Sequence, residues 1–306
     1  SIRRQRQMCI RDSMLSLEAL FCKIDDFCQE FVPQWTQRLL KDGCRQRQRE
    51  RSMSLSEIMT ILVAFHQQGY RNFKTYYHNH VAVYWRSEFP TLVSYSRLIE
   101  YLPSVLLPLC AYLRHCFGTC RGISFIDATV LRVCRIQRAR QHRVFQGLAT
   151  WGKTSMGWFF GLKLHLVVND QGELLNCCLT PGNTDDRKPV LNLLKDCWGQ
   201  VFADRGYVSK DLAHQLWQDY GLQFLAKPRR NMKNSLMPMR DKLLARRRSL
   251  IETVIDQLKN CCQIEHSRHR SPVSCFVHLL SGLIAYCHQP KKPSLNLAAL
   301  GIELPA

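Results

Sequence analysis

The sequence lacks long hydrophobic runs. None of its uninterrupted apolar stretches is long enough to span a bilayer, and no apolar segment typical of a secretory signal stands near the first residue. These absences argue against a membrane-spanning or secreted protein. We therefore expect a soluble, cytoplasmic protein, whose 306 residues and 46% hydrophobic content suffice for a buried core.

Acidic residues are also scarce. The chain has 24 Asp and Glu against 43 Lys and Arg, which gives a net charge of +19 and a pI near 9.5. Such an excess of positive charge is typical of proteins that bind polyanions. Attraction to an anionic membrane surface would use the same charge, but the hydropathy pattern does not favour it. Nucleic acid is the predicted partner.

Regularly spaced cysteines are absent. The fifteen cysteines make up only about 5% of the chain, which argues against a disulfide scaffold and favours reduced, mostly buried thiols. One cluster has metal-like spacing, with Cys262, His266 and His269 in a C-x3-H-x2-H pattern and Cys261 adjacent. It lacks a CxxC partner, so we interpret the cysteines as core residues and the histidines as part of a basic turn, with a structural zinc site as the alternative.

Three acidic residues stand in three different local settings. Asp127 lies inside the apolar run ISFIDATV, Asp204 ends the apolar run QVFAD, and Glu252 lies on a helical pattern rich in Arg and Lys. An Asp in an apolar strand is costly to bury unless it is paired or binds a metal. Carboxylates that converge from separate elements can hold two divalent cations roughly 3.5–4 Å apart, and such a pair catalyses phosphoryl transfer.

Each carboxylate also has a simpler interpretation. Asp204 can be an ordinary turn residue, and Glu252 can be an exposed helix residue paired with Arg248. Asp185 and Asp186 compete as metal ligands, but they precede a predicted helix, so we interpret them as its caps.

The periodicity divides the chain. We expect residues 1–13 to be a non-native or disordered leader and residues 14–118 to be an all-helical domain. In this domain, Pro33 follows the first helix, Ser54 and Glu57 form a capping-box pair, and Pro103 and Pro108 punctuate the last helical stretch. The helices either contain a helix-turn-helix that contacts DNA through residues such as Arg71 and Asn72, or form a packing domain with aromatic residues in its core; both interpretations stay open.

From about residue 119 the apolar period changes from 3.6 to 2. Three strands joined by turns, a helix from about 187 to 197 and a strand ending at Asp204 give a βββαβ order, followed by a helix, a strand and the Glu252 helix. This predicts a mixed-sheet α/β domain over 119–290, with a tail at 291–306. Two strongly basic segments, 132–153 and 227–248, flank the predicted metal site and favour a DNA channel.

Several sequence words together resemble DDE transposases of bacterial insertion sequences, specifically the insertion-sequence 982 family. They include FIDATVLRVCRIQRARQHRVF, ATWGKTSMGWFFGLKLHLVVND, LTPGNTDDRKPV, FADRGYVSK and LIETVIDQLKN. The resemblance runs from Met14 to about Leu295. Arg248 and Lys259 match the Y-x2-R-x3-E-x6-K signature around Glu252, whereas Ala245 stands where the signature has tyrosine.

The resemblance implies an RNase H-like catalytic fold, Mg²⁺ (or Mn²⁺) dependence, and cutting and joining of the element's own DNA ends in the bacterial nucleoid. By motif position, the resemblance implies that Asp127, Asp204 and Glu252 are the catalytic metal ligands. It implies double-stranded DNA as a partner, both the element's terminal repeats and the target DNA. It also implies that copies of the chain form a dimer or higher oligomer. A stand-alone nuclease of the same fold and an inactive DNA-binding relic are the alternatives. The candidate DNA contacts are Arg248, Lys259, Lys163, His165, Arg229, Arg230, Lys233, Arg71 and Asn72.

Overall fold

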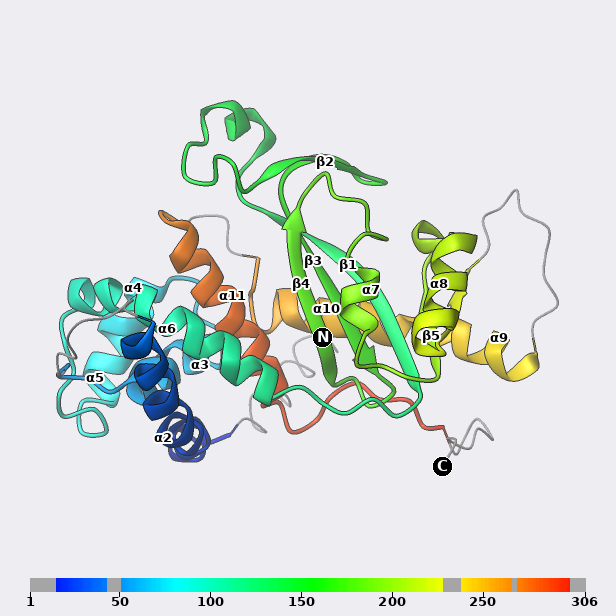
Figure 1. Ribbon diagram of the computed structural model, residues 1–306. Helices are drawn as coiled ribbons and strands as arrows, with labels where there is room; N and C mark the ends of the chain where they lie inside the picture. The colour runs from blue at the N-terminus through cyan, green and yellow to red at the C-terminus, as the bar shows by residue number, and fades with distance from the viewer. Residues whose placement is uncertain (1–14, 43–50, 228–237, 266–268, 298–306) are drawn as a thin grey trace, which may run out of the picture. The chain divides into compact units, whose positions relative to one another are not determined.

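Residues 15–42, 51–227, 238–265 and 269–297 are described by the computed structural model (Figure 1). The predicted leader, most of the predicted tail, and Arg229, Arg230, Lys233 and His266 lie outside these ranges. The chain divides into two compact units. The helical unit comprises residues 1–116, 258–264 and 269–291, and the sheet unit comprises residues 117–257, 265–268 and 292–306.

The helical unit is organised around one buried helix. All residues from Ile58 to Gln67 in this helix, α3, are buried. The predicted capping box of Ser54 and Glu57 opens it, and Gly69, at φ 71°, follows its end. The helices of the unit are α2 (Leu17–Lys41), α3 (Leu55–Gln67), α4 (Phe73–Tyr76), the π-helix η1 (Tyr77–Val81), α5 (Ala82–Tyr84), α6 (Tyr95–His115) and α11 (Pro272–Cys287).

Three prolines lie inside helices of this unit, contrary to what the sequence indicated. Pro33 lies inside α2, and Pro103 and Pro108 lie inside α6. The buried face of each helix continues beyond its prolines, with Thr36 buried in α2 and Leu109 in α6. Packing of these faces outweighs the local cost of an interior proline, about 3 kcal/mol.

Helix α11 belongs to the helical unit, although the sequence grouped it with the predicted domain 119–290. It packs against α3 and α6. The imidazole Nδ1 of His66 lies 2.6 Å from the carbonyl oxygen of Cys262, and the Tyr112 hydroxyl lies 2.9 Å from Nε2 of His288. Most of the surface of α11 is apolar, and the helices around it bury this surface.

The sheet unit contains the predicted βββαβ order with one additional strand, β2. The predicted helix at 187–197 is reduced to one short helix, α7, preceded by turns. The elements are β1 (Ile123–Arg132), the 3₁₀ helix η2 (Ile136–Gln141), β2 (Thr150–Thr154), β3 (Gly157–Asn169), β4 (Leu174–Pro181), α7 (Val190–Leu194), β5 (Gln200–Ala203), the 3₁₀ helix η3 (Arg205–Tyr207), α8 (Lys210–Tyr220), β6 (Gln223–Ala226), α9 (Met239–Arg246) and α10 (Ser249–Asn260).

The six strands form one mixed sheet in the order β2-β3-β1-β5-β6, with β4 also paired to β3. The long strand β3 is antiparallel to β1, β2 and β4, whereas β5 is parallel to β1 and to β6. Gly199, at φ 82°, allows the segment before β5 to approach β1, because a Cβ there would lie 2.3 Å from the carbonyl oxygen of Gly122.

One face of the sheet packs against α7 and α8 (Figure 1). Ile126 of β1, Val201 of β5 and Leu216 of α8 belong to this core. Because side chains alternate along a strand, Asp127 and Asp204, which follow core residues Ile126 and Ala203, point to the opposite face. No helix in the described ranges is long and apolar enough to cross a membrane.

Candidate active site

The pairing of β1 with β5 brings two of the predicted carboxylates together. The strands are parallel, and Phe125 is paired with Phe202. Asp127 and Asp204 each lie two residues further along, so they come side by side and project in the same direction. Asp127 is in β1 and Asp204 directly follows β5, as the sequence predicted.

Arg248 joins the third carboxylate to the other two. Its guanidinium lies 3.1 Å from Oδ2 of Asp127, 3.9 Å from Oδ1 of Asp204 and 2.5 Å from Oε1 of Glu252. Arg248 precedes α10 and is four residues from Glu252, which places the two side chains on adjacent turns. One guanidinium therefore contacts all three carboxylates, an arrangement that the sequence signature did not predict.

The three carboxylates differ in burial. The side chain of Asp127 is 21% exposed, against 48% for Asp204 and 58% for Glu252. Burial raises the pKa of Asp127, and the positive charge of Arg248 opposes this shift. Burial lowers the pKa of Arg248, but the three carboxylates outweigh it and hold that pKa above its ordinary value. The positive charge of Arg248 thus offsets the mutual repulsion of the three carboxylates.

Tyr207 lies beside the candidate site, although no sequence pattern predicts it there. It ends η3, three residues after Asp204, and only 2% of it is exposed. Within the described part of the chain, its buried hydroxyl has no hydrogen-bond partner. Burial, and then the negative charges of Asp127 and Asp186, raise its pKa, so the hydroxyl stays protonated beside the carboxylates. The aromatic residue in ADRGY was the only signal for it in the sequence.

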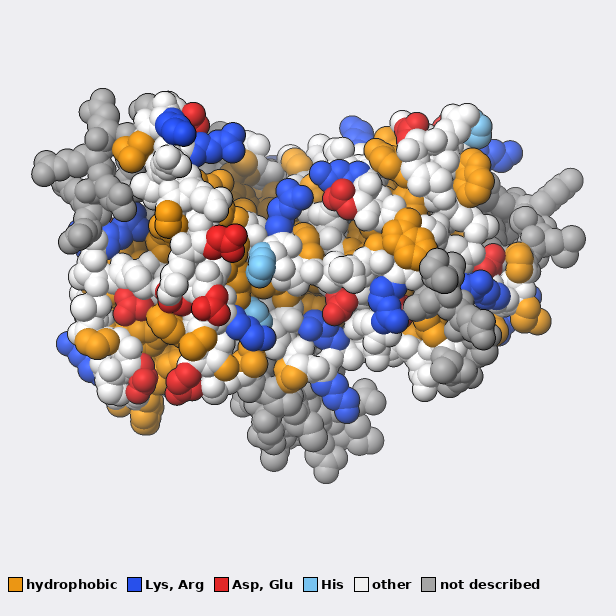
Figure 2. All heavy atoms as spheres, turned by 60° about the horizontal axis from the view of Figure 1, so that its bottom comes forward, with side chains coloured by type: hydrophobic (Ala, Val, Ile, Leu, Met, Phe, Trp, Pro, Cys, Tyr) orange, Lys and Arg blue, Asp and Glu red, His pale blue; other side chains and the backbone are white. Residues whose placement is uncertain are grey.

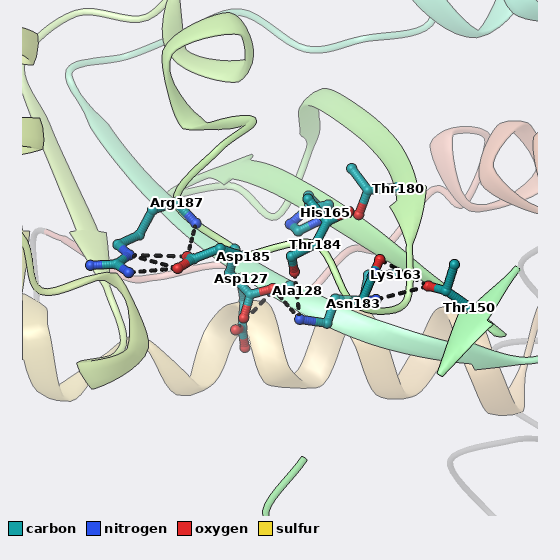
Figure 3. A network of polar contacts seen from close by, with 11 residues as sticks. Asp127, Ala128, Thr150, Lys163, His165, Thr180, Asn183, Thr184, Asp185 and Arg187 are labelled. Atoms are coloured by element: carbon teal, nitrogen blue, oxygen red, sulfur yellow. Dashed lines mark hydrogen bonds and ion pairs between the residues drawn. The ribbon is translucent and has the colours of Figure 1, made fainter. Parts of the chain in front are cut away.

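The two predicted DNA contacts on β3 have other partners. Nζ of Lys163 donates to the carbonyl oxygen of Thr184 at 2.9 Å (Figure 3). It also donates to Oδ1 of Asp186 at 2.9 Å. His165 is completely buried, and its Nε2 lies 2.8 Å from the Thr180 hydroxyl. A ring with no exposed surface cannot contact a phosphate, so we do not retain His165 as a DNA contact.

Asp185 and Asp186 form ion pairs rather than helix caps. Asp185 accepts hydrogen bonds from both the backbone and the guanidinium of Arg187, and these lower its pKa to about 2 (Figure 3). Asp186 pairs with Lys163. The prediction of a helix cap is wrong because α7 begins only after Pro189, beyond a run of turns. Both side chains have structural partners, which agrees with the structural role that we preferred.

The remaining predicted contacts lie in the helical unit or at its border. Arg71 is exposed, and Asn72 is exposed but uses its side-chain oxygen to cap α4 through the Thr75 amide. Phe73, Tyr76 and Tyr77 are buried, which favours the packing interpretation for the aromatic residues of this segment. Lys259 lies on α10, seven residues after Glu252.

The zinc alternative rests on four residues, of which His266 lies outside the described ranges. Cys262 is completely buried, and burial raises the pKa of its thiol. The side-chain amide of Gln289 donates to its sulfur at 3.7 Å. These contacts are those of a core cysteine.

The carboxylates fit a divalent cation in their chemistry. Mg²⁺ prefers oxygen ligands, and all three side chains already converge on one positive group. As the described side chains stand, no group of three His, Cys, Asp or Glu is arranged to hold a metal ion, and the three carboxylates instead contact Arg248.

Comparison with known families identifies the sheet unit. Residues 117–272, half of the chain, match the family model described as a transposase DDE domain. The chain belongs to the DDE transposase family. The matched range contains all three carboxylates together with Arg248. Membership supports a nuclease or transposase class of enzyme with DNA as its partner. The chain has no match among the curated proteins.

Proposed function

We propose that this protein is a transposase that binds the ends of its own insertion element, cuts DNA strands there and joins them to a target. The observation that carries the proposal is the convergence of Asp127, Asp204 and Glu252, from three separate elements, on the single guanidinium of Arg248. The strand order, with antiparallel β4-β3-β1 continued by parallel β5 and β6, supports an RNase H-like catalytic fold. The sequence words support assignment to the insertion-sequence 982 family.

In this proposal, Asp127, Asp204 and Glu252 hold Mg²⁺, or Mn²⁺ in its place. The bound metal supplies an activated water and stabilises charge on the phosphodiester. Asp127 is the most buried of the three, and its Oδ1 is held by the Ala128 amide at 2.9 Å, so its orientation is fixed before DNA binds. With the carboxylates holding a cation, the Arg248 guanidinium would be available to a phosphate, which it could contact in a bidentate manner.

The protein's excess of positive charge supports DNA as its partner. On the face that Figure 2 displays, Lys and Arg side chains occur in several groups with Asp and Glu between them. Affinity for DNA should therefore fall steeply with salt. Lys259 and the predicted contacts Arg229, Arg230 and Lys233 are proposed to take part. Synapsis of two ends would require a dimer or higher oligomer.

Cleavage and strand-transfer assays on duplexes that carry the element's ends test the proposal. The substrate sequence is taken from terminal inverted repeats sought in the DNA that flanks the gene. Nicking followed by joining to a second duplex supports a transposase. Nicking without joining would identify a stand-alone nuclease, and binding without nicking would identify an inactive relic.

Metal dependence is the first expected result. Mg²⁺ and Mn²⁺ should support both cleavage and joining, whereas Ca²⁺ should support binding of the ends only, because its larger and looser coordination shell fits the reaction poorly. Gel assays with each chloride salt after removal of metal by EDTA measure this. Cleavage that persists in EDTA would contradict the role of the three carboxylates.

End recognition is expected to depend on the helical unit. Arg71→Gln should weaken binding to the terminal repeat by about tenfold, as for loss of one base contact, while leaving binding to a scrambled duplex nearly unchanged. Because α11 completes this unit, the full chain is used rather than a fragment ending at 118. Arg38→Gln, at a side chain that is 84% exposed on α2, is the control. Equal losses on both duplexes would mean that Arg71 contacts phosphate only.

A further inference from the structure

Strands β2 and β3 form a hairpin with two exposed tryptophans on one face. In the strand register, Trp151 is paired with Phe160 and Lys153 with Trp158, so these four side chains share a face. Trp151 is 38% exposed and Trp158 is 56% exposed. Burial of a large aromatic side chain is energetically favourable. Two exposed tryptophans at neighbouring positions therefore indicate a surface suited to binding a ligand or a partner.

The other face of the hairpin is already filled. It carries Gly152, which is paired with Phe159. Phe159 is 1% exposed, and a Cβ on Gly152 would lie 2.3 Å from the carbonyl oxygen of Gly182. The hairpin thus packs on the protein through its inner face, and this packing fixes the orientation in which the tryptophan face is exposed.

The segment that contains this hairpin is strongly basic. The sequence from Arg132 to Asn169 contains no Asp or Glu. Nζ of Lys153 lies 5.6 Å from the centre of the Trp158 ring, within range of a cation–π contact. The exposed basic residues of the segment that leads from β1 into the hairpin, and of the hairpin itself, are Arg132, Arg135, Arg138, Arg140, Arg143 and Lys153.

We propose that the tryptophan face, defined by Trp151, Lys153 and Trp158, binds unpaired bases of single-stranded DNA. Flat aromatic rings with positive charge around them fit a strand whose bases stack and whose phosphates are neutralised. A duplex hides the faces of its bases inside the helix, so this surface favours a single strand. The inference rests on the proposed function, because cutting a strand near its end creates a terminus whose last bases can unpair.

Binding of the full chain to a fluorescein-labelled oligothymidylate, followed by fluorescence anisotropy, tests the inference. Trp158→Ala should weaken this binding about tenfold, since the stacking of a base on the indole ring is lost. It should leave binding to a duplex of unrelated sequence unchanged. Trp158→Tyr should keep most of the affinity because it retains a ring. Trp217→Ala, at a tryptophan that is 62% exposed on α8, is the matched control and should behave like the wild type.

An oligothymidylate with abasic sites separates stacking from phosphate contacts. It should bind the wild type at least as weakly as the intact strand binds the Trp158→Ala variant, and its loss of affinity relative to the intact strand should be smaller for the variant, which keeps only Trp151, than for the wild type. Equal losses on single strand and duplex, or no loss at all, would overturn the inference. Sedimentation that shows a smaller species for Trp158→Ala would instead identify the face as a contact between copies of the chain.

The outcome is distinguishable from failure of the proposed function. Asp127→Asn should bind the oligothymidylate like the wild type while losing cleavage. If the wild type cleaves metal-dependently but Trp158→Ala binds normally, only the inference fails. If Trp158→Ala loses single-strand binding but the wild type never cleaves, the inference stands and the proposed reaction fails.

Discussion

Asp127→Asn, Asp204→Asn and Glu252→Gln are each expected to reduce DNA cleavage by about 10³-fold or more. Each change keeps the shape of the side chain but removes the charge that holds a divalent cation, and loss of such electrostatic stabilisation is among the largest single effects in catalysis. Binding of the element's ends should remain, because the three substitutions remove negative charge from a surface that we propose to face phosphates. Cleavage and gel-shift assays on the same preparations measure both quantities.

Asp219→Asn provides a control for the general effect of removing a carboxylate from the sheet unit, since this residue is exposed on α8. It should cleave like the wild type. Substantial cleavage by any one triad variant would remove that residue from the proposed ligand set. Asp186 would then become the first replacement to test, because it also acts electrostatically on Tyr207 beside Asp127.

Arg248→Gln is expected to change stability and metal response together. Without divalent metal, the substitution leaves the partly buried Asp127 without its cation and should lower the free energy of unfolding by about 1–3 kcal/mol. Added Mg²⁺ should raise the Tm of the variant more than that of the wild type, because metal no longer has to displace a guanidinium. Cleavage should also fall, since the variant lacks the group proposed to bind a phosphate. Thermal unfolding in EDTA and in excess Mg²⁺ measures the first two effects.

Arg247→Gln is the matched control for this experiment, as it removes an exposed arginine next in the chain. It should unfold like the wild type under both conditions. Identical Tm values for the two variants, with and without Mg²⁺, would show that Arg248 does not compensate the charge of the carboxylates. Arg248→Lys should fall between them, because an ammonium keeps the charge but cannot contact three carboxylates as a planar guanidinium does.

Much of the fold was predictable because local patterns and tertiary packing agree. The alternation around Asp127 predicts β1, and the Ser54–Glu57 capping box predicts the start of α3; both are present. The predictions failed where packing overrides local preference. Pro103, for example, lies inside α6 rather than ending a helix. Strand β2 was missed for another reason, because its five residues carry too little alternation by themselves.

In the candidate site, too, some features follow from local sequence patterns and others only from tertiary packing. The strand positions of Asp127 and Asp204 follow from apolar runs in the sequence, and their proximity follows from the parallel pairing of β1 and β5. The burial of His165 was not predictable from alternation alone, because β3 is covered on both faces for most of its length. Tyr207 stands next to the carboxylates only because η3 turns the chain back immediately after Asp204.

The sequence by itself determined which chemical groups this protein can use: an excess of positive charge, three carboxylates on separate elements, and motifs that resemble DDE transposases. These features are local or additive, so they can be read without knowing the fold. Only the tertiary structure decided how the groups meet. Arg248 contacts residues 121 and 44 positions away in the chain, and α11 packs on helices that precede it by more than 150 residues. Such contacts depend on strand register and on which helix faces are buried together, and a single sequence carries no direct record of either.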